Sequence, residues 1–497
     1  MSYLFFCYSF GLDSLSRSIR PNLNKLSSNL APINGLNMNL DIVILAAGRG
    51  TRMNSKIPKV LHQIGGNSML SHVLNAARKL GSRRIHIVVG YGAEQIKTEF
   101  SYDTELQWAL QEEQLGTGHA VMQAMPIIDI KKPHKLVLVL YGDVPLTNSA
   151  TLSKLVQQAN ENTLCLLTLV TENPKGLGRI IRSNSGEITA IAEERDANDD
   201  QKKIKEINTG IMVIPATKLN TWLNSLGNDN AQGEYYLTDV VAMAAADDDC
   251  AICAMVIDDE NEVQGVNDKA QLASLERQFQ MKKAEQLLRA GVLLRDPSRI
   301  DIRGEIETGS DVEIDINAIF EGHVILGNGV KIGPNVVIKD SKIADNVKIL
   351  QGTNIDGAEI RRGASVGPYA RIRSGTILEE NTKIGNFVET KNAIIGKGSK
   401  AGHLAYIGDA VIGENVNIGA GTIFCNYDGV NKHKTIIGDN VFVGSNSVLV
   451  APVTLADNTF VAAGSSINSD VPANSLAVAR GKQKNITGWK RPTKKLN

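Results

Sequence analysis

Cysteine, net charge and long apolar runs are all scarce in this sequence, and each shortage excludes a class of protein. Lys plus Arg and Asp plus Glu both number 53, so the charge gives no reason to expect a nucleic-acid partner or an acidic membrane partner. No run of about 20 apolar residues occurs, which excludes a transmembrane helix. The five cysteines are scattered and odd in number, which argues against a disulfide framework and predicts a cytoplasmic protein.

Two of these cysteines, Cys250 and Cys253, form a C-x-x-C pair within an apolar run. No second pair or histidine cluster lies near them, as a zinc site would require. We therefore expect an ordinary buried strand here.

The first 38 residues include an apolar stretch, 3–10, that could be mistaken for a secretion signal. No Lys or Arg precedes the stretch, it is short, and no Ala-x-Ala-like cleavage site follows it. We expect residues 1–38 to be a disordered extension, or the start to be misassigned upstream of the true Met38.

Residues 39–267 alternate short β-branched runs with longer segments of helical character, as a layered α/β domain requires. The segment 69–80 places apolar residues at helical spacing. We predict a parallel sheet with helices packed against it. The candidate strands are 42–46, 85–89, 136–140 and 164–170.

Residues 268–291 predict a helical connector. Leu272, Leu275, Phe279 and Leu287 lie among charged residues, and Gly291 stands where a helix would end.

From residue 292 to 497 aliphatic residues recur every six positions, and several are followed by glycine. A period of six fits a coil in which each side of a triangular turn supplies one inward aliphatic. A glycine-rich β-sandwich would not hold this phase from residue 437 to residue 467. We therefore predict a parallel β-helix, whose flat faces favour side-by-side association. The clearest runs are Val366, Ile372, Leu378 and Ile384, and then Ile437, Val443, Leu449, Leu455, Val461 and Ile467.

A glycine-rich loop follows the first strand, and its sequence at residues 45–53 is LAAGRGTRM. Such a loop lets backbone N–H groups approach phosphates. A dinucleotide fingerprint would need a third glycine where Met53 stands and an acidic residue about 20 positions on, and no Asp or Glu occurs between Asp41 and Glu94. A Walker A sequence is also absent. The two arginines and nearby Lys59 suit the phosphates of a nucleoside triphosphate.

This loop, with Pro58 and Lys59, resembles the signature of sugar-phosphate nucleotidylyltransferases. The motifs that agree in order are Gln111, QLGTGH (114–119), YGD (141–143), Glu193, EINTG (206–210), NAQGEYY (230–236) and GVN (265–267). Over about residues 39–492 the sequence is most similar to the bifunctional uridylyltransferase/acetyltransferases of UDP-N-acetylglucosamine synthesis. The resemblance implies a Rossmann-like α/β nucleotidyltransferase domain, a helical connector and a left-handed parallel β-helix of hexapeptide repeats. It also implies use of the product in peptidoglycan and lipopolysaccharide synthesis.

The resemblance assigns roles in the first domain residue by residue. Asp143 and Asn267 would bind Mg²⁺, which prefers hard oxygen ligands. Arg52 and Lys59 would act catalytically by neutralising phosphate charge while the sugar phosphate attacks the α-phosphorus of UTP and pyrophosphate leaves. The nucleotide and sugar would be held by Leu45, Ala46, Ala47, Gly48, Lys59, Gln111, Gly116, Thr117, Tyr141, Gly142, Asp143, Gly178, Glu193, Asn208 and Asn267.

Simpler structural readings exist for several of these residues. Asp143 could cap a turn, Asn267 could be the N-cap of the connector helix, and Lys59 could be a solvated charge. Glu193 begins the charged run 193–196, and charged runs are usually solvated faces.

The β-helix repeat is interrupted at residues 399–408 and 421–435, and such breaks are where functional loops tend to lie. Transfer of an acetyl group to a sugar amine needs a base, and histidine is the residue type suited to that task near neutrality. His403 in the first break is the candidate proton acceptor. Glu389 is a hypothetical partner that would orient it.

The resemblance also assigns the remaining acetyltransferase residues. Arg373 and Lys391 would bind the phosphate of glucosamine-1-phosphate, with Tyr406 and Asn417 completing that pocket. Acetyl-CoA would lie between neighbouring subunits of a homotrimer. Its pocket would include Ala420, Asn426, Tyr427, Ser445, Ala463 and Arg480. The basic tail, including Lys494 and Lys495, could assist CoA binding or be a solvated end.

Three functions therefore compete. They are a bifunctional enzyme, a uridylyltransferase whose β-helix only assembles trimers, and a related enzyme such as a glucose-1-phosphate adenylyltransferase. The second would predict loss of His403 or Arg373, and both are present. The third would not be expected to combine Lys391, His403 and Tyr406, so the bifunctional enzyme is favoured.

Overall fold

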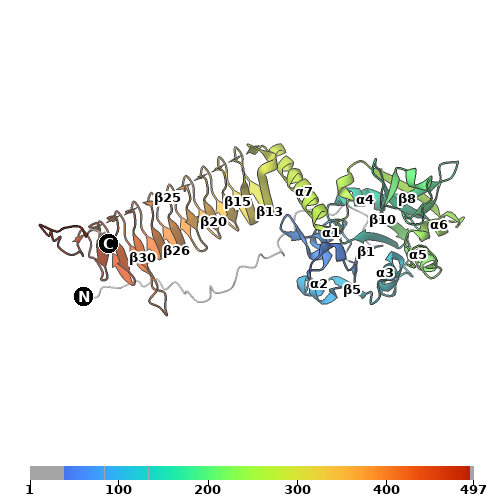
Figure 1. The fold of residues 1–497 in the computed structure, drawn as a ribbon, viewed down its shortest axis with the longest axis horizontal. Helices are drawn as coiled ribbons and strands as arrows, with labels where there is room; N and C mark the ends of the chain where they lie inside the picture. Colours follow the sequence, from blue (N-terminus) through green and yellow to red (C-terminus); the bar gives the residue numbers. More distant parts are fainter. Residues whose placement is uncertain (1–38, 83, 133, 493–497) are drawn as a thin grey trace, which may run out of the picture.

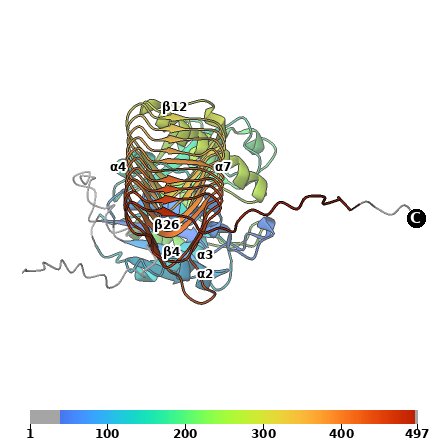
Figure 2. The same ribbon diagram turned by 90° about the vertical axis from the view of Figure 1, so that its left-hand side faces the viewer.

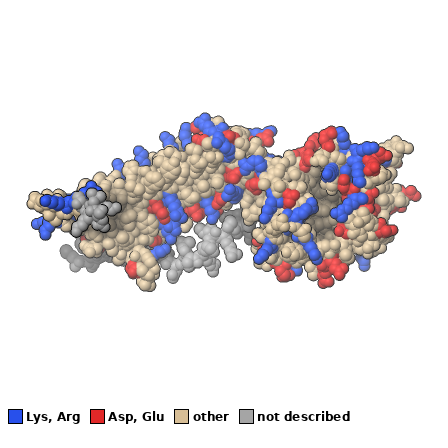
Figure 3. All heavy atoms as spheres, in the orientation of Figure 1, with Lys and Arg blue, Asp and Glu red and all other residues tan. Residues whose placement is uncertain are grey.

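The computed structural model describes residues 39–82, 84–132 and 134–492. The predictions for residues 1–38 and for Lys494 and Lys495 lie outside these residues. The molecule is elongated, with an α/β domain at one end, a long β-helix at the other and helix α7 between them (Figure 1). Positive and negative side chains are intermingled over the face that Figure 3 shows, in keeping with the balanced charge.

The first domain is built on one mixed sheet, and all four predicted strands belong to it. Its main strands lie in the order β11 (Ala251–Ile257), β7 (Thr163–Val170), β10 (Glu206–Pro215), β6 (Leu136–Tyr141), β1 (Leu40–Ala46), β4 (Ile85–Val89) and β5 (Leu106–Leu110).

The expectation of a wholly parallel sheet is wrong at β10, which runs antiparallel to both β6 and β7. A parallel return to the sheet needs a crossover, usually a helix. Between β7 and β10 the chain instead forms the antiparallel pair β8 (Arg179–Arg182) and β9 (Ile188–Ala192). The chain therefore re-enters the sheet in the opposite direction.

Helices cover both faces of this sheet, because alternate strand residues point to opposite sides. Val43 of β1 packs in one apolar cluster with residues of α3 (Thr117–Ala124), α5 (Ala216–Leu223) and α6 (Asp239–Ala245). Its neighbours Ile42 and Ile44 pack in the other, with α1 (Met69–Arg78) and α4 (Ser149–Gln158). The short helix α2 (Ala93–Glu99) buries Ile96 against the second cluster.

The expectation that the cysteines are unpaired is wrong for Cys165 and Cys253, which form a disulfide. The two residues are register partners on the parallel strands β7 and β11, with Cα atoms 4.7 Å apart. The sequence separates them by 88 positions, so the pairing depends on strand order. Cys250 is free, and β11 is half-buried because it lies at the edge of the sheet.

The predicted connector is α7 (Lys269–Arg289), and Gly291 follows it with a φ of 94°. Asp268, rather than Asn267, caps its N-terminus by accepting a hydrogen bond from the Gln271 N–H. The buried Gln280 side chain exchanges two hydrogen bonds with the backbone of Ile302 in the β-helix. The Glu276 carboxylate accepts from the Gly65 N–H, next to the small hairpin β2 (Gln63–Ile64) and β3 (Asn67–Ser68) of the first domain. Both domains thus bond to this helix.

Residues 293–477 form stacked coils whose short strands pair in parallel with the coil above and below (Figure 2). All the period-six aliphatics of the two clearest runs are buried, which confirms the β-helix interpretation. One sheet contains β12 (Leu293–Leu294), β14 (Glu313–Ile314), β16 (Lys331–Ile332), β19 (Lys348–Ile349), β22 (Ser365–Val366), β25 (Lys383–Asn386), β27 (Lys400–His403), β29 (Asn417–Ile418), β32 (Phe442–Val443), β35 (Phe460–Val461) and β37 (Leu476–Ala477).

The other two sides of the coils share a second sheet. It contains β13 (Ile300–Thr308), β15 (Ala318–Leu326), β17 (Val337–Lys339), β18 (Lys342–Ile343), β20 (Asn354–Asp356), β21 (Glu359–Ile360), β23 (Arg371–Ile372), β24 (Ile377–Leu378), β26 (Glu389–Ile395), β28 (Tyr406–Ile412), β30 (Ile423–Cys425), β31 (Thr435–Ile437), β33 (Val448–Val450), β34 (Val453–Leu455) and β36 (Ser466–Ile467). Across the described ranges, no helix is both long and apolar enough to cross a membrane.

Candidate active sites

The glycine-rich loop leaves the carboxyl end of β1 and turns back toward Lys59. Gly50 has a φ of 59°, and a Cβ there would lie 2.7 Å from the Lys59 Cβ, so a side chain would be strained and would displace the lysine. Gly48 is exposed, and a Cβ there would meet nothing within 4 Å. The Gly142 N–H donates to the Leu45 carbonyl (2.9 Å). The loop and the YGD motif therefore share one edge of the sheet.

At this edge each predicted metal ligand is held by a predicted phosphate-binding cation. Lys59 is paired with the Asp143 carboxylate, and Arg52 donates to the Asn267 side-chain oxygen (3.0 Å). A backbone hydrogen bond from Val266 N to Asp143 O (3.0 Å) brings Asn267 beside Asp143. The fold thus gathers two oxygen ligands and two cations from sequence positions 84 apart in the pair Lys59 and Asp143 and 215 apart in the pair Arg52 and Asn267.

These oxygens suit a hard divalent cation that is only partly held by protein. Within residues 39–82, 84–132 and 134–492, no three His, Cys, Asp or Glu side chains group closely enough to hold a metal by themselves. Mg²⁺ commonly binds through one or two protein oxygens and completes its shell with phosphate oxygens and water. Asp143 and Asn267 fit that mode of binding.

The second predicted nucleotide-binding segment lies at the end of β5. The Gln111 amide donates to the Gly116 carbonyl (3.1 Å), and Gln114 donates to the Gln111 carbonyl (3.2 Å). Thr117 Oγ1 accepts from the Leu237 N–H (3.1 Å) at the start of α3. Gly116 has a φ of 111°, and a Cβ there would clash with the backbone of Tyr235. These bonds fix the amide of Gln111 at a buried position.

The predicted sugar-binding residues meet beside β10. The Asn208 N–H donates to the Gly178 carbonyl (2.8 Å), and a Cβ on Gly178 would lie 2.9 Å from Ile191. Glu193 accepts from the Thr238 hydroxyl (2.9 Å) instead of lying on a solvated face. Burial raises the pKa of Glu193, and it also raises the pKa of Tyr141. The Glu193 carboxylate is therefore held in a partly buried position by a hydrogen bond to Thr238.

In the β-helix, His403 lies exposed at the end of β27, in the first break of the repeat. Its ring Nδ1 lies 2.5 Å from Oδ1 of Asn386, one coil earlier. Glu389, the hypothetical partner, is instead paired with Arg373, whose Nη1 donates to Glu389 Oε1 (2.8 Å). The structure thus gives His403 a different partner from the one suggested by sequence, and gives Arg373 a carboxylate that orients it.

Lys391 lies near both Arg373 and Lys432, and sequence reasoning did not identify Lys432. A hydrogen bond and repulsion from Lys432, followed by repulsion from Arg373, lower the pKa of Lys391. Lys432 belongs to the loop in the second break, where it forms a β-bridge with Tyr427. Glu389 pairs with only one of these three cations, so the group carries excess positive charge that an anion would stabilise. Lys432 is therefore a further candidate for the phosphate site.

The same loop is tied to the coils by a chain of side chains. The buried Asn426 amide donates to Asp409 (2.5 Å), which also accepts from Asn392 (2.6 Å). Within the loop, backbone N–H donation from Asn431 and contact with His433 hold the pKa of Asp428 below its ordinary value. Tyr427, in contrast, is 60% exposed. Asn426 is therefore fixed in the core of the coil, while the exposed Tyr427 ring is held at the surface of the loop by its hydroxyl, which donates to the Gly429 carbonyl (2.5 Å).

The remaining predicted acetyl-CoA residues lie on successive coils. Asn446 N donates to the Ala420 carbonyl (2.7 Å), and Gly464 N donates to the Ser445 carbonyl (2.8 Å). Arg480 Nη1 donates to the Ala463 carbonyl (2.8 Å). Asn417, predicted instead for the sugar-phosphate pocket, begins β29 and is the register partner of Lys400, so it lies one coil beyond β27. These residues form an open surface.

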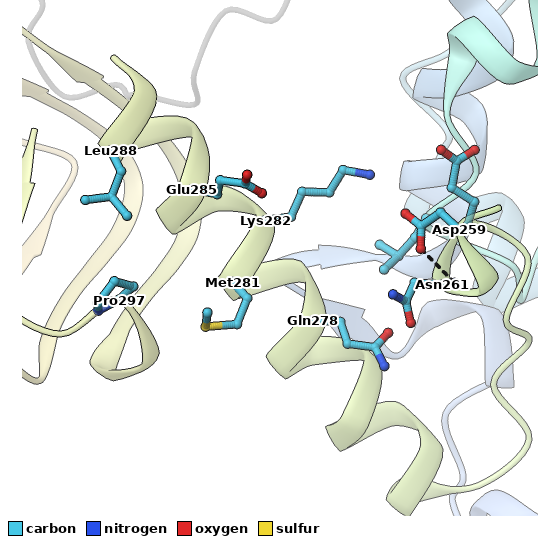
Figure 4. Close-up of a pocket in the computed structure, with 10 residues that line it drawn as sticks. Asp259, Asn261, Gln278, Met281, Lys282, Glu285, Leu288 and Pro297 are labelled. Carbon is cyan, nitrogen blue, oxygen red and sulfur yellow. Dashed lines mark hydrogen bonds between the residues drawn. The ribbon is translucent and has the colours of Figure 1, made fainter. Parts of the chain in front are cut away.

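A separate pocket of about 430 Å³ lies between α7 and the loop carrying Asp259 and Asn261 (Figure 4). It is lined by apolar groups such as Met281 and Leu288 and by charged groups such as Lys282. None of the predicted site residues lines it, so this pocket is distinct from both candidate sites.

The comparisons with known proteins agree with both halves of this description. The MobA-like NTP transferase domain family matches residues 42–197, and the bacterial transferase hexapeptide family (six repeats) matches residues 305–340 and 434–469. These matches and the two sites define a nucleotidyltransferase joined to a hexapeptide acyltransferase.

Full-length relatives identify the particular family. Bifunctional protein GlmU of Marinobacter nauticus is 54% identical over 92% of this chain and 99% of its own length. The GlmU proteins of Stutzerimonas stutzeri (52%) and Cellvibrio japonicus (54%) each match over 92% of this chain and all of their own length. A solved structure of HddC from Yersinia pseudotuberculosis aligns with 49% of the chain at 18% identity, with a TM-score of 0.36.

The chain belongs to the GlmU family. It is a bifunctional enzyme of UDP-N-acetylglucosamine synthesis, which transfers acetyl from acetyl-CoA to glucosamine-1-phosphate and then couples the product to UTP, releasing pyrophosphate.

Proposed function

We propose that the two activities reside in separate sites, with uridylyl transfer in residues 39–267 and acetyl transfer in residues 292–497. Residues 268–291 would be a linker. The pairing of Lys59 with Asp143 beside Arg52 and Asn267 is the observation that best supports the first site. The enzyme would act in the cytoplasm, where UTP and acetyl-CoA are made.

In the first site the loop 45–53 and Gln111 would bind the nucleotide, and Glu193 and Asn208 would hold the sugar. Mg²⁺, held by Asp143 and Asn267, would stabilise the charge that develops on the phosphates. Lys59 and Arg52 would then turn from these two oxygens toward the triphosphate. The sugar phosphate oxygen attacks the α-phosphorus in line and pyrophosphate leaves, so the chain needs no covalent nucleophile.

In the second site Arg373, Lys391 and Lys432 would bind the phosphate of glucosamine-1-phosphate, with Tyr406 and Asn417 beside the sugar. His403 would take the proton from the amine as it attacks the thioester carbonyl of acetyl-CoA, and the CoA thiol would leave. Asn426 and Arg480 would bind the CoA moiety.

We further propose that the β-helices associate as a homotrimer, with acetyl-CoA bound between neighbouring subunits. The exposed stacked rings of Phe442 and Phe460, 4.6 Å apart, support association through the β-helix. A molar mass of three chains by light scattering is the expected result. A monomer with full acetyl transfer would refute it.

The test of the two sites uses glucosamine-1-phosphate, acetyl-CoA, UTP and Mg²⁺ with separate assays of free thiol and pyrophosphate. His403→Ala should release no thiol, yet form pyrophosphate from supplied N-acetylglucosamine-1-phosphate. Asp143→Ala should release thiol normally and form no pyrophosphate. Loss of both products in either variant, with unchanged unfolding temperature, would contradict two independent sites.

A further inference from the structure

Asn386 is the nearest polar partner of His403 in the stacked coils. The two residues are register partners on β25 and β27, separated by 17 positions, which is one turn of the coil. Their side chains meet through Asn386 Oδ1 and His403 Nδ1 at 2.5 Å. The Asn386 carbonyl also accepts from the Leu404 N–H (3.1 Å), so a second bond holds the two coils together at this point.

An amide oxygen can only accept a hydrogen bond. The contact therefore places the imidazole proton on Nδ1 and leaves Nε2 with a free lone pair. We propose that Asn386 is a positioning residue for acetyl transfer, which fixes His403 in the tautomer whose Nε2 accepts the proton of the sugar amine. The inference rests on the proposed role of His403 as the base.

The neutrality of Asn386 matters as much as its oxygen. A carboxylate at this place would orient the ring equally well, but would also favour the imidazolium, which is no longer a base. The charged groups on the adjoining strands are Lys383 and Lys400, which are register partners of each other. On the strands that follow in the second sheet, Glu389 of β26 is paired with Arg373, and Tyr406 begins β28. The amide thus orients the ring without adding charge.

The backbone beside the pair is strained. Phe387 and Leu404, which directly follow Asn386 and His403, have φ angles of 55° and 51°. Most other non-glycine residues with positive φ in the β-helix are Asn or Asp, which tolerate that conformation. Phe387 and Leu404 are 58% and 59% exposed, so burial does not account for them. Bulky residues in left-handed conformations cluster at functional sites.

The test compares the pH dependence of acetyl transfer in variants of the full-length enzyme. Asn386→Leu keeps the size but removes the acceptor, and kcat should fall by up to roughly 100-fold, the lower end of what a positioned general base contributes. Asn386→Asp keeps the acceptor and should retain most activity at high pH, while the acid limb of its profile moves to higher pH. Asn346→Asp, which adds the same charge at an exposed corner of an earlier coil, should leave the profile unchanged.

Two outcomes would overturn the proposal. These are full acetyl transfer by Asn386→Leu, and a profile of Asn386→Asp that coincides with that of Asn346→Asp. Pyrophosphate formation and the unfolding temperature report whether each variant folds. If the Leu variant does not fold, the profile of the Asp variant decides. Acetyl transfer by His403→Ala would instead refute the proposed base, so the two failures are distinguishable.

Discussion

Gly385 lies one residue before Asn386, where two coils come into close contact. A Cβ at Gly385 would lie 1.9 Å from the Gly402 carbonyl oxygen, whereas real Cβ contacts essentially never fall under 3.0 Å. Gly385→Ala therefore has to separate the coils that carry Asn386 and His403 by at least about 1 Å, and displacements of that size cost on the order of 100-fold in rate. We expect thiol release to fall by that factor.

The assay for Gly385→Ala compares thiol release with pyrophosphate formation from supplied N-acetylglucosamine-1-phosphate, which should not change. Gly402→Ala is the matched control for folding, because a Cβ there would meet nothing within 4 Å of the chain. Its unfolding temperature should equal that of the unsubstituted enzyme, whereas that of Gly385→Ala should be lower. Acetyl transfer at the full rate by Gly385→Ala would refute the reasoning that this contact sets the geometry of the base.

Four further predictions follow from the structure. Lys432→Ala should raise KM for glucosamine-1-phosphate roughly 10-fold with a smaller effect on kcat, because a hydrogen bond to a charged group is worth about 1.5–3 kcal/mol; steady-state thiol assays that show an unchanged KM would exclude it from the phosphate site. Chelation by EDTA should abolish pyrophosphate formation and leave thiol release intact, and added Mg²⁺ should restore the lost activity; uridylyl transfer in the presence of the chelator would contradict the metal site. Burial raises the pKa of Glu193, so its ionisation destabilises the fold above that pKa and has no effect below the unfolded value of about 4.5. Thermal melts of Glu193→Gln should therefore show a gain in stability at neutral pH that disappears in acid. A loss of stability at neutral pH would contradict this prediction. Ile360→Ala removes a fully buried side chain from the β-helix and should cost about 2–5 kcal/mol. Denaturant melts should show this loss with uridylyl transfer retained, and an unchanged midpoint would contradict it.

The sequence was most informative where one residue pattern determines local structure. Burial of Ile372 and Leu449 follows from the six-residue period alone, since a coil side supplies one inward residue. The direction of β10 was not predictable in this way, because it depends on the β8–β9 pair that replaces a helix crossover. The Cys165–Cys253 disulfide likewise depends on strand order.

In the candidate sites too, sequence motifs identified single residues, whereas the contacts between them depend on the fold. The motifs identified Asp143 and Asn267, but only the fold pairs them with Lys59 and Arg52. Asn386 was missed as the partner of His403, although its separation of 17 residues equals one coil and could have indicated it. Lys432 gave no such signal, because its loop lies outside the repeat and its position depends on the β-bridge to Tyr427.

The stacking of coils also determines which changes in chain length the enzyme tolerates. Between Ile349 and Ile418 successive register partners are 17 or 18 positions apart, so an insertion or deletion of one whole coil keeps every aliphatic residue pointing inward. Other lengths would shift the alternation and expose the core. The longest step in this sheet, from Ile418 to Val443, spans 25 positions, and its added residues include the Asn426–Lys432 loop. The β-helix can therefore lengthen by whole coils without altering its chemistry, whereas new binding groups enter as loops within a coil.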